Sequence, residues 1–177
     1  VDMYYRIQQQ RVRAGQQARA LAEKQQPDLF AWWVADQFLE FENCVKSLLN
    51  EWVDLQPLGI WCKSIKGVGG VLAAGLMSYI DIEKAPTVGH IWRYAGLDPT
   101  IKWGKGEKRP YNAKLKTICW RIGESFVKVK NLPDDVYGKI YEERKHYEME
   151  KNKRKEYMDQ AIEILAKKNI GKNTIAY

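Results

Sequence analysis

Cysteine and histidine are scarce in this chain of 177 residues, which contains three of the first and two of the second. The cysteines are odd in number and show no paired spacing, which argues against a disulfide framework and a zinc knuckle. Only His90 and His146 add to the metal-binding side chains, so we expect no metal site and no cofactor. Ordinary buried thiols in a reducing cytoplasm are the expected state of Cys44, Cys62 and Cys119.

Long apolar runs are also absent. Residues 68–82 come closest, but Gly70, Gly75, Ser78 and Asp81 interrupt them, so no segment is long and apolar enough to cross a membrane. No signal-peptide pattern is present. The chain opens on Val1 without a Met, which leaves open whether a further piece, a leader included, precedes it. We therefore expect a cytoplasmic protein with no membrane partner.

Acidic residues are outnumbered by basic ones. The chain has 29 Lys and Arg against 22 Asp and Glu, a formal net charge of +7 and a pI near 9.2. This balance favours a polyanion partner, or an acidic protein that mimics one. Hydrophobic residues make up 45%, which excludes a wholly disordered chain, and 177 residues suffice for one or two small domains with a buried core.

Seam residues spaced alternately by four and three positions predict two long helices at the start of the chain. The seam of the first helix, residues 2–24, consists of Met3, Ile7, Gln10, Ala14, Ala18 and Leu21. The seam of the second, residues 29–55, consists of Phe30, Val34, Phe38, Phe41, Val45, Leu48 and Trp52. Pro27 separates the helices and Asp28 is placed to cap the second. We expect an antiparallel hairpin at residues 1–56, called the arm below, which is either a packing element or a coiled-coil spacer or dimerisation surface.

The rest of the chain predicts further helices and no strand pattern beyond the loop near Trp103. Short helices are expected at residues 60–65, 70–80 and 88–95, an exposed loop at 100–111, and longer helices at 113–130 and 136–168. The last helix alternates acids and bases so densely that it is expected to be solvated or to protrude, and residues 169–177 are expected to fray. We therefore predict an all-α fold in three parts, namely the arm (1–56), a globule (57–130) and a charged C-terminal helix with its tail (131–177).

A glycine-spaced turn, Ile65-Lys66-Gly67-Val68-Gly69, leads into an apolar helix that starts near Gly70. Glycines permit positive φ and a close approach of a ligand to the main chain. The unpaired N–H groups and the dipole of the following helix favour an anion there. The turn therefore predicts a phosphate site made by Lys66, Gly67, Val68, Gly69 and Gly70, although a plain helix–helix turn uses the same glycines.

A basic segment with interleaved aromatic rings follows. Between residues 102 and 121 only Glu107 is acidic. The cations are Lys102, Lys105, Lys108, Arg109, Lys114, Lys116 and Arg121, and the rings are Trp103, Tyr111 and Trp120. Cations neutralise phosphates and flat rings stack on sugars or unstacked bases, so this segment predicts contact with a nucleic acid. The alternative is a solvated loop and an outer helix face, with Trp120 in the core.

Four short segments follow one another in an order typical of one family. They read IKGVG (65–69), LAAGL (72–76), YIDI (79–82) and WRYAGLDP (92–99). From Leu58 to Val127 the chain resembles the C-terminal transposase domain of insertion-sequence transposases that carry an N-terminal RuvC-like domain. The resemblance implies a helix-hairpin-helix core, DNA rather than RNA as the partner, and a prokaryotic, phage or mobile-element origin. Arg93 is then expected to extend the contact with the backbone.

Departures from the family's pattern bear on catalysis. The family's loop carries a nucleophilic Ser beside Gly, whereas residues 101–107 contain no Ser, and the acidic residues of a RuvC-like nuclease are not found upstream. Lys66 replaces the usual Pro of the turn and adds a cation. Asp81 and Glu83 form a short acidic pair at a helix end, where capping is the expected role. Tyr111 is the remaining candidate nucleophile, without a matching base, so we expect no catalytic centre here.

The preferred interpretation is a DNA-binding protein related to transposases that grips the phosphate backbone without a catalytic centre of its own. One alternative is an active transposase or recombinase subunit completed by a missing N-terminal domain or a partner chain. Another is an interaction or inhibitor protein of a phage or mobile element. The candidate protein partners are a second copy, through the arm, and another protein, through the C-terminal helix.

Overall fold

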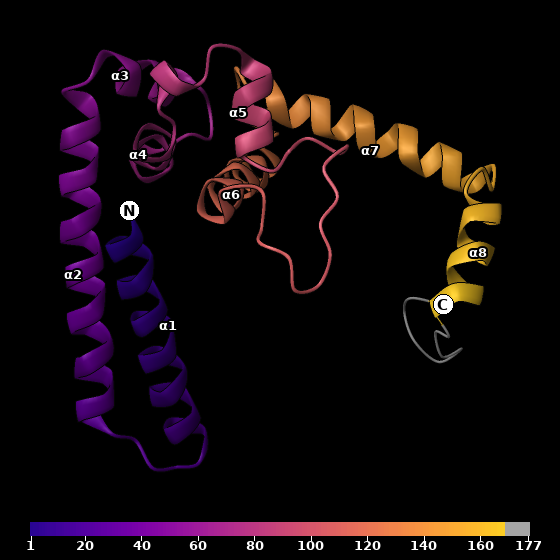
Figure 1. The fold of residues 1–177 in the computed structure, drawn as a ribbon. Coiled ribbons are helices and arrows are strands. Elements are labelled where there is room, and N and C mark those ends of the chain that lie inside the picture. Colours follow the sequence, from indigo (N-terminus) through magenta and orange to yellow (C-terminus); the bar gives the residue numbers. More distant parts are fainter. Residues whose placement is uncertain (169–177) are drawn as a thin grey trace. The chain divides into compact units, whose positions relative to one another are not determined.

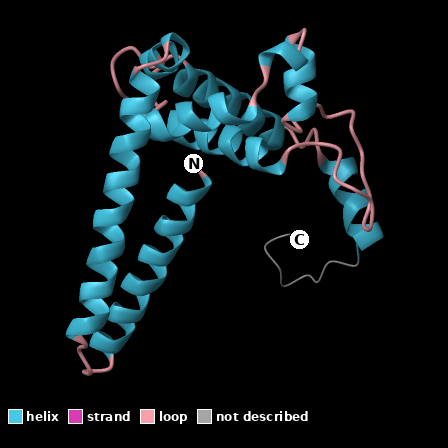
Figure 2. Ribbon diagram, turned by 60° about the vertical axis from the view of Figure 1, so that its left-hand side comes forward, coloured by secondary structure: helices cyan, strands magenta, loops and turns pink. Residues whose placement is uncertain are grey.

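The computed structural model describes residues 1–168, and every regular element within them is a helix (Figure 1, Figure 2). The predicted all-α fold is confirmed. The chain divides into two compact units, Val1–Lys128 and Val129–Tyr177. The further division of the first unit into arm and globule stays a prediction. No helix in the described part is long and apolar enough to span a bilayer. The predicted fraying of residues 169–177 falls outside the described residues.

The helices begin and end close to the predicted positions over most of the chain. Those of the first unit are α1 (Asp2–Glu23), α2 (Leu29–Asp54), α3 (Pro57–Ser64), α4 (Gly70–Tyr79), the 3-10 turn η1 (Ile82–Lys84), α5 (Val88–Tyr94) and α6 (Ala113–Val129), which reaches the boundary. Those of the second unit are α7 (Tyr137–Lys153) and α8 (Met158–Lys168).

The predicted antiparallel hairpin is formed by α1 and α2, which lie side by side (Figure 1). Asp28 caps α2 as predicted, because its Oδ1 accepts a hydrogen bond of 2.9 Å from the N–H of Phe30. In α1 the predicted seam is right at Ile7 and Ala18, which are buried. It is wrong at Met3, which is 53% exposed, since the neighbouring tyrosine takes the buried position.

The face that α2 turns toward the interior is not the predicted one. Ala35 and Glu42 are buried, whereas the exposed members of the predicted seam are Phe30, Phe41, Leu48 and Trp52. Cys44 is exposed as well, so the expected burial of its thiol is wrong. The physical reason lies in α1, whose side chains are mostly Gln, Arg and Ala. Helix α1 therefore has no wide apolar face that could cover large rings, and the residues of α2 that pack against it are the small Ala35 and the hydrogen-bonded Glu42.

Glu42 is the polar centre of the arm. Only 6% of this residue is exposed, and its carboxylate accepts hydrogen bonds from Tyr4 Oη (3.1 Å), Gln8 Nε2 (2.9 Å) and Arg11 Nε. Burial alone would raise the pKa of Glu42, but these hydrogen bonds outweigh burial and hold this pKa below its ordinary value. Burial together with the bond to Glu42 raises the pKa of Tyr4 to about 12, so the phenol stays protonated as a donor. A buried carboxylate with three matched donors fixes the register of the two helices.

Glu42→Gln is expected to lower the free energy of unfolding by about 2 kcal/mol at pH 7, because the charge-assisted bonds are lost while the donors stay buried. The folded pKa of Glu42 is depressed, so its contribution is present at neutral pH and is lost as the pH falls through that folded pKa. Urea unfolding of both proteins at pH 7 and pH 3 checks this. A difference between the two proteins that does not shrink at pH 3 would contradict the prediction.

The core of the first unit forms where α2, α3 and α4 meet. Its buried side chains are Val53, Cys62, Val68, Ala73 and Ala74. Glycines allow the helices to approach closely here. A Cβ added at Gly59 would lie 2.2 Å from the backbone oxygen of Val53, and one added at Gly70 would lie 1.9 Å from Asn50 Oδ1. The position of α4, and of the turn that precedes it, therefore depends on Gly59 and Gly70 having no side chain.

Gly59→Ala is expected to destabilise the fold by about 3 kcal/mol, since the new methyl group meets backbone that cannot move aside cheaply. The matched control is Gly123→Ala on α6, where a Cβ meets no atom within 4 Å. That control is expected to be neutral or to stabilise by about 0.5–1 kcal/mol, because Ala favours the helix. Denaturant unfolding of the two variants separates close packing from helix propensity, and equal effects would refute this account.

In the second unit the predicted single helix over residues 136–168 is wrong, because α7 and α8 are separate. Lys155 adopts a φ of 59°, and the N–H of Glu156 donates to the carbonyl of Lys151 at 3.1 Å. This is a Schellman-type helix end in which Lys takes the position usually held by glycine. Four cations within residues 151–155 repel one another in a continuous helix, and they suit a C-terminus, where the helix dipole favours positive charge.

Candidate nucleic-acid interface

The glycine turn, residues 65–70, joins α3 to α4. Gly67 has a φ of 95°, a conformation that favours glycine, and its carbonyl accepts a hydrogen bond of 2.6 Å from Ser125 Oγ on α6. The N–H of Val68 donates to the carbonyl of Ile65 at 3.0 Å, and the side chain of Val68 is buried in the core. The turn is thus held from the inside by the core and from one side by α6.

Gly69 is the residue of the turn that stays open. It is the N-cap of α4 and has an ordinary φ of −85°, so within the turn only Gly67 uses the positive φ that glycine permits. A Cβ added at Gly69 meets no atom within 4 Å. The first N–H groups of α4 have no intrahelical partner, and they carry the positive end of the helix dipole. The predicted anion position is therefore accessible, with Lys66 exposed beside it.

A cavity of about 490 Å³, called the turn cavity, lies against Gly69 and Gly70. The charged and aromatic residues among those that line it are Tyr4, Tyr5, Lys46, Trp120, Arg121, Glu124 and Lys128. The guanidinium of Arg121 lies 3.5 Å from the centroid of the Tyr5 ring, and its Nη1 is buried with no hydrogen-bond partner. Lys128 Nζ lies 3.1 Å from the carboxylate of Glu124, so three cations and one carboxylate line the cavity and its net charge is positive.

Arg121 was predicted from the sequence, but Lys46 and Lys128 were not. Lys46 comes from the middle of α2, and Lys128 comes from the end of α6, outside the basic segment. No local pattern marks either residue, because their proximity to the turn depends on how α2 and α6 pack around α4. The structure thus adds the arm to the predicted phosphate site.

The basic segment forms a second, aromatic–cationic cluster of Trp103, Arg109, Tyr111 and Lys116. The Trp103 and Tyr111 rings meet edge to face at 6.5 Å, and the Arg109 guanidinium lies 5.3 Å and 5.7 Å from their centroids. Lys116 Nζ lies 4.7 Å from the Tyr111 ring. A hollow of about 310 Å³ adjoins this cluster. Trp120 lines both this hollow and the turn cavity and is 65% exposed, so it is not a core residue.

The remaining predicted cations are not gathered at one point. Lys102, Lys105 and Lys108 are exposed on the loop, which Glu107 closes by accepting a hydrogen bond of 2.8 Å from the N–H of Gly104. Lys114 forms an ion pair with Asp2 of α1. Arg93 lies 3.8 Å from Asp98 and is largely exposed on α5. None of these five residues lines the turn cavity or the hollow beside the aromatic–cationic cluster.

The structure also bears on the residues considered for catalysis. Among the described residues no three or more His, Cys, Asp or Glu side chains are grouped as a metal site. Asp81 has the expected capping role, because its Oδ1 accepts a hydrogen bond of 3.2 Å from the N–H of Glu83. The Tyr111 ring packs so closely on Gly96 that an added Cβ there would lie 2.6 Å from it. This contact gives Tyr111 a packing role.

Comparison with known proteins shows that the central part of the chain is similar to a transposase domain. Residues 62–130 match the model of the family described as Transposase IS116/IS110/IS902. The matched segment runs from the end of α3 to the end of α6, so it contains the glycine turn, the basic loop and Arg121. The match confirms the predicted resemblance as a partial transposase domain. No curated protein and no solved structure matches the chain.

Proposed function

We propose that this chain is a transposase-related DNA-binding protein that grips the sugar–phosphate backbone with a helix-hairpin-helix made by α3, the glycine turn and α4. The observation that carries the proposal is the turn cavity. It joins the open N-terminus of α4 at Gly69 to Lys46, Arg121 and Lys128. A phosphate placed there meets backbone N–H groups, the helix dipole and three cations, of which Lys128 is paired with Glu124.

The aromatic–cationic cluster extends this contact. Trp120 lies between the turn cavity and the cluster, so a strand held at Gly69 is able to continue toward Arg109 and Lys116. Lysines on the loop add charge without fixed geometry, which suits contact with successive phosphates. Both groups offer cations, aromatic rings and backbone N–H groups, which are contacts to phosphate and sugar, so we expect binding governed by backbone and shape.

The family match favours DNA transposition as the process in which this binding is used. Residues 101–107 hold no Ser at the position where the family resemblance expects the nucleophile. We therefore infer that this part of the protein contributes DNA binding, and that any strand cleavage is supplied by another domain or chain.

Gly69→Asp is expected to weaken duplex DNA binding at least tenfold at moderate salt, because the carboxylate occupies the phosphate position and takes up the α4 N–H groups. The side chain has room, and Asp is a favoured N-cap, so the variant stays folded. Gly69→Asn is the matched control with the same shape and no charge. Fluorescence anisotropy over a salt series measures both variants, and the slope for Gly69→Asp is expected to be smaller by about one counterion.

Equal DNA affinity of wild type and Gly69→Asp would show that the turn is not the phosphate site. A wild-type chain that binds neither DNA nor RNA at moderate salt would overturn the proposed function as a whole. RNA bound more tightly than DNA of the same sequence would contradict the choice of DNA.

We also propose that the arm forms a homodimer through α2. Large apolar side chains lie exposed along this one helix, at spacings that bring them to one side: Phe30, Trp33, Phe41, Leu48, Trp52 and Leu55. A row of this kind on a 26-residue helix is larger than a monomer usually leaves in water, and its heptad-like spacing suits the same helix of a second copy. A protein partner of the charged helix α7 stays a prediction.

Leu48→Lys is expected to convert the dimer to a monomer at micromolar concentration, since it places a charge in the middle of the apolar row. Ser47→Lys adds the same charge at an exposed position on another side of α2 and is expected to leave the dimer intact. Light scattering coupled to size-exclusion chromatography gives the mass of each. A monomeric wild type, or equal effects of both variants, would contradict the proposed interface.

A further inference from the structure

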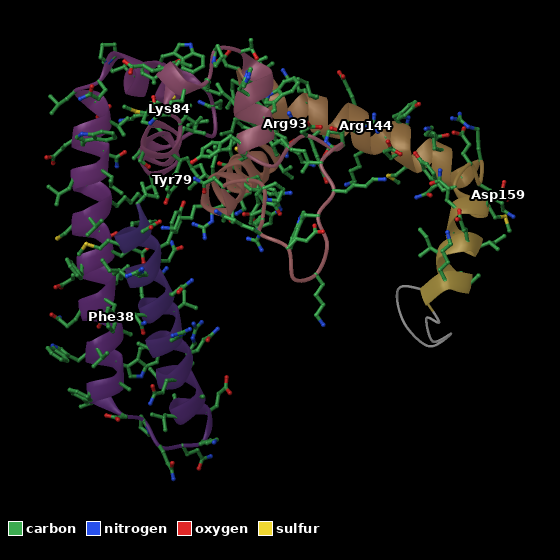
Figure 3. All side chains as sticks on the ribbon, viewed as in Figure 1. Phe38, Tyr79, Lys84, Arg93, Arg144 and Asp159 are labelled. Atoms are coloured by element: carbon green, nitrogen blue, oxygen red, sulfur yellow. The ribbon has the colours of Figure 1, made fainter. Side chains whose placement is uncertain are left out.

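A second cavity, called the α5 cavity, lies where α4, η1 and α5 meet. Its volume of about 470 Å³ is within the range of roughly 300–1,000 Å³ typical of small-molecule sites. The residues on which its chemistry depends are Tyr79, Lys84, His90, Ile91, Arg93 and Tyr94. Figure 3 labels Tyr79, Lys84 and Arg93, which come from α4, η1 and α5. The proposed binding of the DNA backbone at the glycine turn does not involve this cavity.

The two tyrosines of the α5 cavity are held in place by their hydroxyl groups. Tyr79 donates a hydrogen bond to Asp2, and Asn112 Nδ2 donates one of 2.9 Å to the hydroxyl of Tyr94. Burial, together with the bond to Asp2, raises the pKa of Tyr79 to about 12, so this ring stays neutral. Fixed, flat, neutral rings provide the kind of surface on which nucleobases stack.

The polar groups of the α5 cavity suit the rest of a nucleotide. His90 Nδ1 lies 2.8 Å from Thr87 Oγ1, which leaves Nε2 as the ring nitrogen free to bond the edge of a base. Lys84 and Arg93 are exposed cations, each beside a carboxylate, and Arg93, which lies 3.8 Å from Asp98, is the less closely paired of the two toward a phosphate. Asp81 also lines the cavity, but Lys84 Nζ lies 2.7 Å from its carboxylate and offsets that charge. The net charge of the lining is therefore positive.

From this arrangement we infer that the α5 cavity receives one unstacked nucleobase of the bound DNA, with the adjoining phosphate beside Lys84 or Arg93. The inference rests on the proposed DNA binding and adds a preference for DNA with an unpaired base. Extruding a base from an intact duplex costs free energy that an already unpaired base does not require. Stacking on an aromatic ring then adds affinity of about tenfold.

The experiment compares three duplexes that differ at one position: fully paired, carrying a single unpaired 2-aminopurine, and carrying an abasic site in its place. The wild type is expected to bind the unpaired base about tenfold more tightly than the other two, and to change the 2-aminopurine fluorescence. The abasic duplex separates recognition of the base from recognition of a bent backbone. Similar affinity for the abasic and 2-aminopurine duplexes would overturn the inference.

Tyr94→Leu keeps the apolar bulk and removes the aromatic ring. It is expected to abolish the preference for the unpaired base and to leave affinity for the paired duplex within twofold of wild type. If circular dichroism shows that Tyr94→Leu is unfolded, His90→Ala at the exposed start of α5 is tested in its place. This variant is expected to reduce the preference for the unpaired base about threefold.

The failure of this inference is distinct from failure of the proposed function. Binding of all three duplexes with equal affinity and without a fluorescence change overturns the base site and leaves backbone binding intact. No binding to any duplex overturns both.

Discussion

The close approach of α4 to its neighbours is the constraint on which the first unit depends. Ala73 and Ala74 are almost fully buried in the core, and Gly70 leaves no space for a Cβ beside Asn50 of α2. On another side, a Cβ at Gly75 would lie 2.8 Å from Ile118 Cδ1 of α6. Larger side chains on α4 would push α2 and α6 outward. The small residues therefore define where the helix N-terminus points and which side chains surround it.

Helix α6 connects this packing to the candidate interface. Ile118 contributes to the core, and Ser125 bonds the carbonyl of Gly67, so the same helix supports α4 and the turn before it. Arg121 lies three residues after Ile118 and four before Ser125, so the three side chains are neighbours on one face of α6. Trp120 faces the aromatic–cationic cluster as well as the turn cavity. One amphipathic helix thus couples the core, the proposed phosphate site and the basic loop.

The sequence predicts well where the helices begin and end, but it predicts poorly which face of each helix is buried. The signals that place the helices are local: Asp28 as a cap, the glycine turn and the apolar spacing of α6. The observed helices begin and end close to these signals. The inward face of α2 depends on the bonding of Glu42 to residues 31–38 positions away, which no local pattern contains. The same holds for Lys46, since only tertiary packing brings it to the turn cavity. The sequence does not predict the break near Lys155, because a helix end with positive φ is usually marked by glycine and here the residue is Lys.

The central claim, that the open N-terminus of α4 holds a DNA phosphate, is tested most directly by nuclear magnetic resonance of the chain labelled with ¹⁵N-glycine. A short paired duplex is added at low salt, and the amide signals of the glycines are followed. The account predicts saturable shifts of Gly69 and Gly70 that reverse on adding salt, while Gly15 on the arm and Gly123 on α6 stay unchanged. Shifts confined to Gly104 and Gly106, with Gly69 and Gly70 unmoved, would place the DNA on the basic loop and contradict the claim.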